Sequence, residues 1–348
     1  MSPYILATLL FGLGLGTTMT FASSHWFLAW MGLEINTLAI IPLMAQQHHP
    51  RAVEATTKYF LTQATAAATL LFASTINAWL TGQWDIQQMS HPLPTTLITL
   101  ALCLKIGLAP LHLWLPEVLQ GLDLTTGLIL ATWQKLAPFA LLMQIQPANS
   151  TILILLGLTS TLVGGWGGLN QTQLRKILAY SSIAHLGWMV LVMQYSPTLT
   201  LLTLITYITM TLSTFLVFKL NKATSINMLA TSWAKAPALT ALAPLILLSL
   251  GGLPPLTGFM PKWLILQELT KQSLAPTATV AALSALLSLY FYLRLTYAMT
   301  LTMSPNNLTG TTPWRLQTKQ LTLPLTTSTM ATLTLLPLAP TAIALLNP

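Results

Sequence analysis

Four ionisable residues stand inside long apolar stretches of this sequence: Glu34, Lys105, Lys135 and Lys262. A charged side chain at the centre of a bilayer costs roughly 2.5–3.5 kcal/mol even on the lenient insertion scale. Such residues face the interior of a helix bundle, and they usually mark an ion or proton path. These four residues are therefore the first candidates for chemistry in the chain.

A lysine in a dry bundle can act as a switchable proton carrier. Burial disfavours the charged ammonium, whereas a carboxylate within about 4–6 Å favours it. Glu34 can therefore hold a proton on a neighbouring lysine, and losing that partner or charging a second lysine releases the proton. Two alternatives remain open: Glu34 as a structural ion-pair partner, and Lys262 as a helix-end residue that extends to the surface. Long uncharged flanks make such extension less favourable for Lys105 and Lys135.

Two histidines extend this set. His185 lies in AYSSIAHLGW, in the middle of an apolar stretch, and its imidazole can relay protons between Lys135 and Lys262. His112 follows a Gly/Pro interruption and is predicted to line the same path. The alternative for each is a neutral ring that is hydrogen-bonded to a nearby serine or backbone group.

The elements that hold these residues must be membrane helices. The chain has 348 residues, of which 54% are hydrophobic and only 6% are charged, whereas a soluble domain carries roughly 25% charged residues. Apolar runs recur from end to end, each long enough to cross a hydrocarbon core of about 30 Å. The sequence predicts an all-α membrane protein with one polytopic transmembrane domain over residues 1–348.

We predict about eleven spans, with a polar loop at 304–320 before the last one. Met1–Phe21 is read as the first span, because it has neither the basic start of a signal peptide nor the Arg-rich character of a transit peptide. The predicted spans are 3–21, 25–45, 56–80, 95–119, 123–145, 150–169, 174–194, 198–219, 238–268, 275–300 and 321–346.

The positions of the basic residues agree with this count. Loops after odd-numbered spans hold only Lys271. Because cytoplasmic or matrix loops are enriched in Lys and Arg, the asymmetry places the N-terminus on the matrix or cytoplasmic side and the C-terminus on the opposite side. Loops and helix ends after even-numbered spans hold Arg51, Lys58, Arg175, Lys176, Lys219, Lys222, Lys235, Arg294, Arg315 and Lys319.

Spans four and nine contain glycine and proline in their middles. Span four includes LCLKIGLAPLHLWLPE, and span nine includes LLSLGGLPPLTGFMPKW. Proline removes a backbone donor and clashes with the preceding turn, so each helix is predicted to break there. Freed backbone groups persist at membrane depth only where protein buries them or water reaches them. Two broken spans indicate an internally repeated transporter whose site lies at mid-membrane.

Several other classes of function are excluded. A single cysteine, Cys103, supports neither a thiolate zinc site nor an iron–sulfur cluster. The basic residues are spread singly and form no patch for nucleic acid, despite a net charge of +8. No phosphate-binding loop follows a strand, and no pair of histidines suits haem. The chain is therefore expected to have no redox centre of its own.

The sequence resembles the animal mitochondrial members of the NADH:ubiquinone oxidoreductase chain 2 family. The resemblance covers the whole chain. It is carried by MGLEINTLAIIPL, KYFLTQATAA, KIGLAPLHLWLPEVLQG, WQKLAPF, GGLNQTQLRKILAYSSIAHLGWM and GGLPPLTGFMPKW. These strings are long, and their order and spacing match the family.

The resemblance implies an antiporter-like, proton-translocating subunit in the membrane arm of respiratory complex I, in the mitochondrial inner membrane. By position, Glu34 and Lys105 match the family's carboxylate–lysine pair, Lys135 its central lysine, and Lys262 the ionisable residue beside the second broken helix. The resemblance also implies other membrane-arm and accessory subunits and membrane lipid as partners. NADH, FMN, iron–sulfur clusters and ubiquinone are expected in other subunits.

Two other functions compete with this interpretation. A stand-alone cation/proton antiporter shares the same ancestry, and dependence on partner subunits distinguishes the two. A purely structural membrane scaffold is the third possibility. Four charges within the spans and two interrupted helices argue against a scaffold, because both features are costly to keep.

Overall fold

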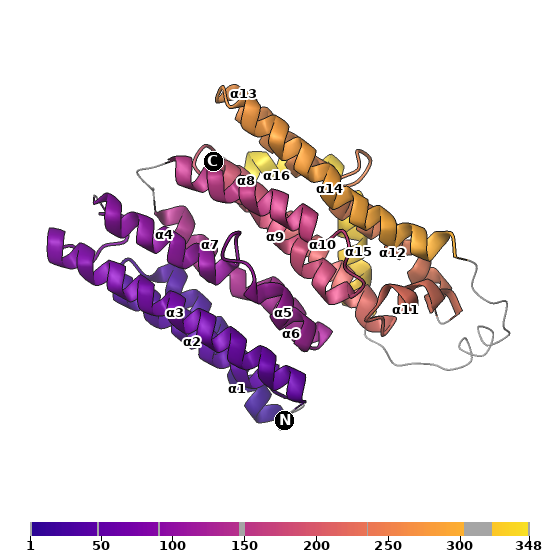
Figure 1. Ribbon diagram of the computed structural model, residues 1–348, viewed down its shortest axis with the longest axis horizontal. Coiled ribbons are helices and arrows are strands. Elements are labelled where there is room, and N and C mark those ends of the chain that lie inside the picture. The colour runs from indigo at the N-terminus through magenta and orange to yellow at the C-terminus, as the bar shows by residue number, and fades with distance from the viewer. Residues whose placement is uncertain are drawn as a thin grey trace. The chain divides into compact units, whose positions relative to one another are not determined.

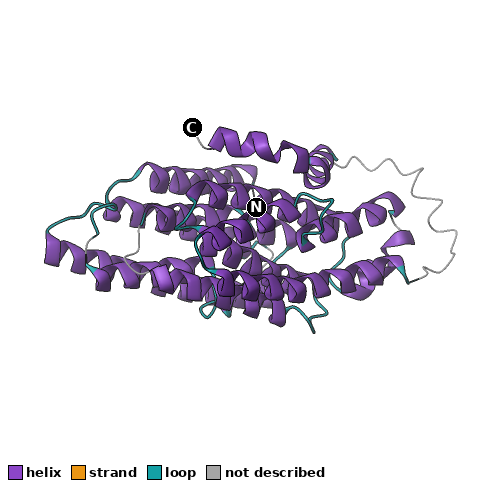
Figure 2. Cartoon of the chain, turned by 90° about the horizontal axis from the view of Figure 1, so that it is seen from above, coloured by secondary structure: helices purple, strands orange, loops and turns teal. Residues whose placement is uncertain are grey.

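The computed structural model of the chain describes residues 2–46, 49–89, 91–145, 150–234, 236–302 and 322–346. Within these ranges the chain forms α-helices and short 3-10 helices without a strand (Figure 2). The predicted polar loop at 304–320 lies outside the described residues. The contacts divide the chain into two compact units, Met1–Leu156 and Gly157–Pro348. The single transmembrane domain stays a prediction.

The first unit is built around α3 and α4. In Figure 1, α1, α2 and α3 run side by side, and α4 packs between α3 and α7. The short helix α5 packs against α3. The helices of this unit are α1 (Pro3–Ala22), α2 (Trp26–Met44), α3 (Pro50–Thr81), α4 (Pro92–Ile106), α5 (Trp114–Gly121), α6 (Leu124–Ala131), α7 (Trp133–Gln144) and the start of α8 (Ser150–Gly167).

Loop histidines start three of these helices. The Nδ1 atoms of His25, His49 and His91 accept hydrogen bonds from backbone amides in the first turns of α2, α3 and α4. The first amides of a helix have no partner within the helix, so each ring satisfies one of them. Pro50 and Pro92 occupy the first helical positions, where a missing amide costs nothing.

In the second unit, α9 and α10 form the centre. Helix α9 packs against α10, α13 and α14, and α10 also packs against α12, α13 and α15 (Figure 1). The unit holds the end of α8, then α9 (Leu174–Val192), α10 (Pro197–Leu220), α11 (Ile226–Ala230), η1 (Thr231–Ala234), α12 (Pro237–Gly251), α13 (Phe259–Lys271), α14 (Ala275–Thr300), α15 (Leu323–Thr334), η4 (Leu336–Leu338) and α16 (Ala339–Leu346).

Among the described residues, six helical stretches are long and apolar enough to cross a membrane. Shorter apolar helices are Pro92–Ile106, Thr151–Gly167 and Pro237–Gly251. The total of eleven spans stays a prediction. The helix that carries the third predicted span begins at Pro50 rather than at residue 56. The six stretches are Pro3–Ala22, Trp26–Met44, Pro50–Thr81, Leu124–Gln144, Pro197–Leu220 and Ala275–Thr300.

Helices α4 and α12 end in the same way. Gly107 (φ 85°) follows α4 and Gly252 (φ 83°) follows α12, both in the left-handed region that glycine adopts without strain. The amides of Leu108 and Leu253 then bond to the carbonyl oxygen five residues earlier, at 3.0 and 3.3 Å. This pattern satisfies carbonyls that a helix end leaves without partners. A non-helical segment follows each glycine before α5 and α13 begin.

Two further discontinuities were not expected from the sequence. The fifth predicted span is divided at Thr132 into α6 and α7, and the eleventh is divided into α15, η4 and α16. Pro138 inside α7 removes the amide that would bond the carbonyl of Gln134, and its ring crowds that carbonyl. Pro337 lies in η4 and has no amide to continue the ladder of α15.

Candidate functional site

Lys105 and Lys135 line one cavity in the first unit. Lys105 lies in the last turn of α4 and Lys135 in the first turn of α7, and their exposed fractions are 6% and 3%. The cavity has a volume of about 20 Å³. Helices α2, α3, α5 and α6 complete its wall. Its lining residues are Leu33, Asn36, Thr37, Tyr59, Gln63, Lys105, Ile106, Trp114, Leu130, Gln134, Lys135 and Pro138.

The cavity suits one water molecule. A space of about 10–15 Å³ or more holds a water if it offers two to four polar partners. Lys105 Nζ and both amide atoms of Asn36 are buried and form no hydrogen bond with any described residue. Leaving such a group unsatisfied costs roughly 1–3 kcal/mol, and more for a charge. A water here would therefore have donors and acceptors ready on two helices.

Glu34 stands beside this cavity on α2 and does not line it. Its carboxylate interacts electrostatically with Lys105 and with Tyr59. Thr37, which does line the cavity, donates a hydrogen bond from its hydroxyl to Glu34 Oε2 at 3.0 Å. Within the described ranges no ion pair joins Glu34 to Lys105 directly. The Glu34 carboxylate and the Lys105 ammonium group thus interact electrostatically without direct contact.

Side chains from α3 and α5 hold the end of α4 in place. The Trp114 indole Nε1 donates to the carbonyl of Leu104 at 3.1 Å, and the Gln63 amide donates to the carbonyl of Lys105 at 3.4 Å. Both carbonyls belong to the last turn of α4, where no further helical amide is available. Protein groups therefore satisfy the backbone that the interruption frees, and they fix the position of Lys105.

His112 lies in the segment between α4 and α5. Its side chain is 7% exposed, and Nδ1 lies 3.3 Å from the carbonyl oxygen of Pro110. A carbonyl can only accept, so Nδ1 carries a proton in this contact. His112 is not among the residues that line the cavity of Lys105 and Lys135. The structure does not bring these three residues together at one cavity.

Lys262 and His185 belong to the second unit. Lys262 is half-buried in the first turn of α13, and Nζ donates to the carbonyl oxygen of Gly251 at 2.8 Å. Gly251 ends α12, and a helix C-terminus carries partial negative charge that favours a cation. The lysine therefore closes the interruption by joining α13 to the end of α12.

The environment of His185 on α9 defines which ring nitrogen can take a proton. Nδ1 lies 2.7 Å from the carbonyl oxygen of Ser181, so Nδ1 is the donor in this contact. In the neutral ring, Nε2 then holds the lone pair, and this atom is buried. The His185 ring lies against the ring of Tyr207, with centroids 5.7 Å apart.

Some polar residues around these sites were not identified from the sequence. Asn36, Gln63 and Gln134 line the lysine cavity, and Tyr207 and Tyr292 are buried near His185 and Gly251. An amide inside an apolar span is itself a signal, because an unsatisfied amide at membrane depth is costly. Serine and threonine carry less information, since their hydroxyls bond the preceding turn of their own helix.

The described part of the chain contains no group of three or more His, Cys, Asp or Glu side chains that could hold a metal ion. Cys103 is buried in α4 and is not part of a disulfide. The buried polar side chains of the described residues are lysines, histidines, amides and hydroxyls. These groups are suited to proton exchange and hydrogen bonding.

Two families of known proteins match this chain. The family described as NADH:quinone oxidoreductase/Mrp antiporter, TM, matches residues 23–288. The family described as NADH dehydrogenase subunit 2 C-terminus matches residues 289–343. Together the two matches cover residues 23–343, which include every candidate site residue described above.

Similar proteins span the full chain. NADH-ubiquinone oxidoreductase chain 2 from Tetraodon nigroviridis is 77% identical over 100% of both chains. A chain of respiratory complex I from Thermus thermophilus is 28% identical, with a TM-score of 0.87 over 99% of this chain and 80% of that one. A chain of the Mrp complex from Dietzia shares the fold at 16% identity, with a TM-score of 0.83 over 97% of this chain and 76% of that one. The chain therefore belongs to the NADH:quinone oxidoreductase/Mrp antiporter membrane family, in its NADH-ubiquinone oxidoreductase chain 2 branch.

Proposed function

We propose that this chain is a core membrane-arm subunit of respiratory complex I that translocates protons, coupled to NADH oxidation and ubiquinone reduction elsewhere in the complex. The observation that carries the proposal is the water-sized cavity in the first unit. Two buried lysines, Lys105 and Lys135, line it. The full-length relative named NADH-ubiquinone oxidoreductase chain 2 supports the choice of complex.

The cavity suggests how a proton moves in the first unit. Glu34 favours the charged form of Lys105, and a proton passes between Lys105 and Lys135 through a water that Asn36 helps to hold. If about 6 Å separates two ammonium groups, they repel by roughly 3 kcal/mol at an effective dielectric constant of about 20. Moving one charge against 100 mV takes about 2.3 kcal/mol. Charging one lysine can therefore expel a proton from the other.

In the second unit, His185 and Lys262 take the corresponding roles. His185 accepts a proton at Nε2, because Nδ1 is held by the Ser181 carbonyl. Lys262 exchanges its proton beside the end of α12, where Gly251 stabilises the ammonium. His112 is proposed as a relay residue at the interruption that follows Lys105. The two interrupted helices bring non-helical, hydrogen-bonding backbone to the sites where protons are proposed to be exchanged.

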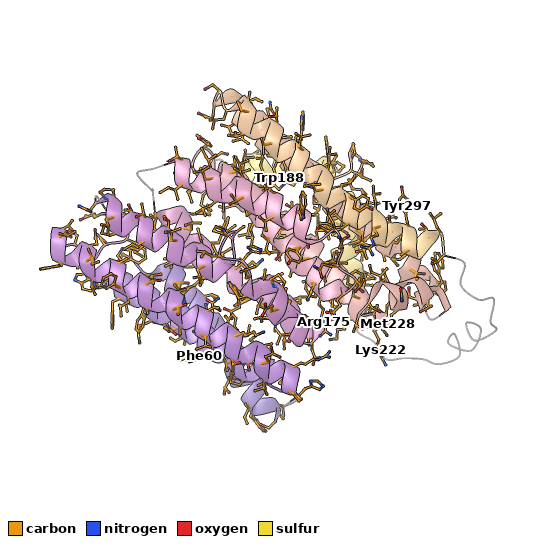
Figure 3. The ribbon with its side chains drawn as sticks, in the orientation of Figure 1. Phe60, Arg175, Trp188, Lys222, Met228 and Tyr297 are labelled. Atoms are coloured by element: carbon orange, nitrogen blue, oxygen red, sulfur yellow. The ribbon has the colours of Figure 1, made fainter. Side chains whose placement is uncertain are left out.

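We propose eleven spans, with the N-terminus in the matrix and the C-terminus in the intermembrane space. Arg175 at the start of α9 and Lys222 after the end of α10 lie at the same end of the second unit (Figure 3). The backbone supports this, because Leu174 N bonds to Thr224 O at 3.1 Å. Basic residues gathered at one end of adjacent helices are expected on the matrix side.

The partners follow from this role. Other membrane-arm and accessory subunits of complex I cover parts of the apolar surface, and membrane lipid covers the rest. NADH, FMN, iron–sulfur clusters and ubiquinone bind in other subunits, so the contribution of this chain is proton transfer. The alternative is a stand-alone cation/proton antiporter. We retain it because the chain shares its fold with a chain of the Mrp complex.

A native gel separates these two functions. Membranes are solubilised in mild detergent, and the gel is stained for NADH dehydrogenase activity and probed for this chain. Co-migration with the activity is expected. Migration as a small species without activity would favour the antiporter, and cation-driven proton flux would then be measured.

Lys135→Met tests the proton-transfer role in the assembled complex. Loss of a proton-transfer group typically lowers rates by about 10²–10⁴-fold, although shared rate control reduces the observed effect. We expect proton pumping and NADH:ubiquinone activity to fall together by about tenfold or more, with assembly retained. Lys58→Met is the control, because Lys58 is exposed and pairs with Glu54 and Glu117 on the surface. Normal pumping by assembled Lys135→Met complex would contradict the proposal.

A further inference from the structure

Two tyrosine hydroxyls are buried in the second unit, where the membrane supplies no water. Tyr207 on α10 and Tyr292 on α14 are each 1% exposed. The two interact electrostatically with each other. A buried tyrosine normally finds a hydrogen-bond partner. Tyr292 Oη, however, forms no hydrogen bond within 3.5 Å to any described residue.

Two serines of α9 face these tyrosines. Tyr207 interacts with the Ser182 hydroxyl and Tyr292 with the Ser181 hydroxyl. Each serine donates its own proton to α9, Ser181 to the carbonyl of Leu178 at 2.8 Å and Ser182 to that of Ala179 at 2.7 Å. The serine oxygens are therefore left as acceptors that point the tyrosine hydroxyls toward α9.

One end of this hydroxyl cluster reaches His185. The His185 and Tyr207 rings are 5.7 Å apart between centroids. His185 lies one turn after Ser181 and bonds to its carbonyl, so the imidazole and both serines share one face of α9. Since Nδ1 lies against the Ser181 carbonyl, Nε2 is the ring nitrogen that a proton relay would use.

The other end reaches the interruption between α12 and α13. A β-carbon placed on Gly251 would lie 3.8 Å from Cδ2 of Tyr292. The carbonyl of Gly251 accepts the hydrogen bond from Lys262 Nζ at 2.8 Å. Helix α13 also packs against α9, α10 and α14, which carry the cluster. The edge of the Tyr292 ring and the Lys262 ammonium therefore both lie beside Gly251.

We propose that Tyr207 and Tyr292, positioned by Ser181 and Ser182, relay protons between His185 and Lys262. A phenol passes a proton by accepting one on its oxygen while donating its own, so it is neutral before and after and no electron moves. The hydroxyl then rotates back for the next proton. A single water can close any gap wider than a hydrogen bond. This inference rests on the proposed proton-translocating function.

The test replaces each hydroxyl by hydrogen in the assembled complex, reconstituted into sealed vesicles. Tyr292→Phe and Tyr207→Phe keep the ring and remove only the relay group. Tyr290→Phe and Tyr297→Phe are matched controls on α14, because these side chains are 58% and 55% exposed (Figure 3 labels Tyr297). NADH-driven proton uptake and its solvent isotope effect in D₂O are measured for each variant.

We expect Tyr292→Phe and Tyr207→Phe to lower coupled turnover by about tenfold, since a lost proton-transfer group typically costs more than that, and to enlarge the isotope effect. The controls should match the parent complex. A purely structural role would reduce the amount of assembled complex without changing the isotope effect per complex. If one variant fails to assemble, the other still decides.

The outcomes separate the relay from the underlying function. Parent-like rates and isotope effects in an assembled Tyr292→Phe or Tyr207→Phe complex would overturn the relay. Lys262→Met serves as the reference, with exposed Lys271→Met on the same helix as its control. A pumping defect in Lys262→Met beside normal tyrosine variants would reject only the tyrosine path. Normal pumping in Lys262→Met and in the two tyrosine variants would count against proton transfer anywhere in this unit.

Discussion

Individual side chains in the first unit surround an ionisable group that is buried in the interior of the protein. Lys105 Nζ and the amide of Asn36 have no hydrogen-bond partner among the described residues, and both face a space the size of one water. Glu34 acts on Lys105 electrostatically from outside that space. A carboxylate that is near but not in contact can favour the charged ammonium without immobilising it, which suits the proton exchange proposed for this site.

Glu34→Gln tests this arrangement with almost no change of shape. Without the carboxylate, Lys105 loses the partner that favours its charged form. We expect proton pumping and NADH:ubiquinone activity to fall several-fold in the assembled complex, with an altered pH profile. The pH dependence of turnover in sealed vesicles is the measurement. Glu54→Gln is the control, since Glu54 is exposed at the start of α3. Pumping and a pH profile that both match the parent would remove Glu34 from the site.

Among the elements, the helix ends α4–Gly107 and α12–Gly252 are the most informative. Both glycines have left-handed backbone, and both are followed by a leucine whose amide bonds back into the helix. The two ends differ in what completes them. Trp114 and Gln63 bind carbonyls at the end of α4, whereas Lys262 itself binds the end of α12. The second interruption therefore depends directly on an ionisable group.

Gly252→Ala is expected to disturb that contact. An alanine with positive φ costs about 1–2 kcal/mol, and its β-carbon would lie 3.0 Å from both Cδ and Nζ of Lys262. The complex should therefore lose thermal stability and also lose coupled turnover. Gly82→Ala separates the two effects, because Gly82 has φ 73° but nothing within 4 Å of an added β-carbon. We expect Gly82→Ala to lower the thermal midpoint with turnover retained. Equal turnover in both variants would argue against a role for the Lys262 contact.

At the scale of the whole molecule, two features bear on function: the division into two compact units and the positions of the basic residues. Each unit contains a helix that ends at a left-handed glycine, α4 in the first and α12 in the second, and at least one buried lysine or histidine. The internally repeated transporter stays a prediction. The basic residues lie on one side of the predicted topology, and this asymmetry predicts that the N-terminus faces the matrix and the C-terminus the intermembrane space.

Epitope tags test the orientation in intact mitoplasts, where only the intermembrane side is accessible. A tag at the C-terminus should bind antibody without permeabilisation, whereas a tag at the N-terminus should require it. A tag within residues 304–320 serves as an internal comparison, since this loop follows an even-numbered predicted span. Labelling of the N-terminal tag in intact mitoplasts would reverse the orientation, and equal labelling of both termini would rule out an odd number of spans.

Much of the architecture was predictable because it depends on local chemistry. Apolar length defines the membrane helices, and their bounds follow from proline and from the capping residues that precede them. The isolated charges Glu34, Lys105, Lys135 and Lys262 stand out for the same reason: each is costly in an apolar run. The divisions at Thr132 and after Thr334 were missed, since proline within a membrane helix often causes only a bend.

Only the tertiary structure decided which of these residues meet. Lys105 and Lys135 share one cavity because α4 packs against α7, and no spacing along the chain encodes that contact. Lys262 bonds to the carbonyl of Gly251 only because the segment between α12 and α13 folds back. The ring of Tyr292 on α14 lies beside the same glycine. By itself, the sequence determined where charge enters an apolar environment, because the cost of burial is a property of each residue. The path of a proton depends on atoms a few ångströms apart, and those distances exist only after the helices have packed.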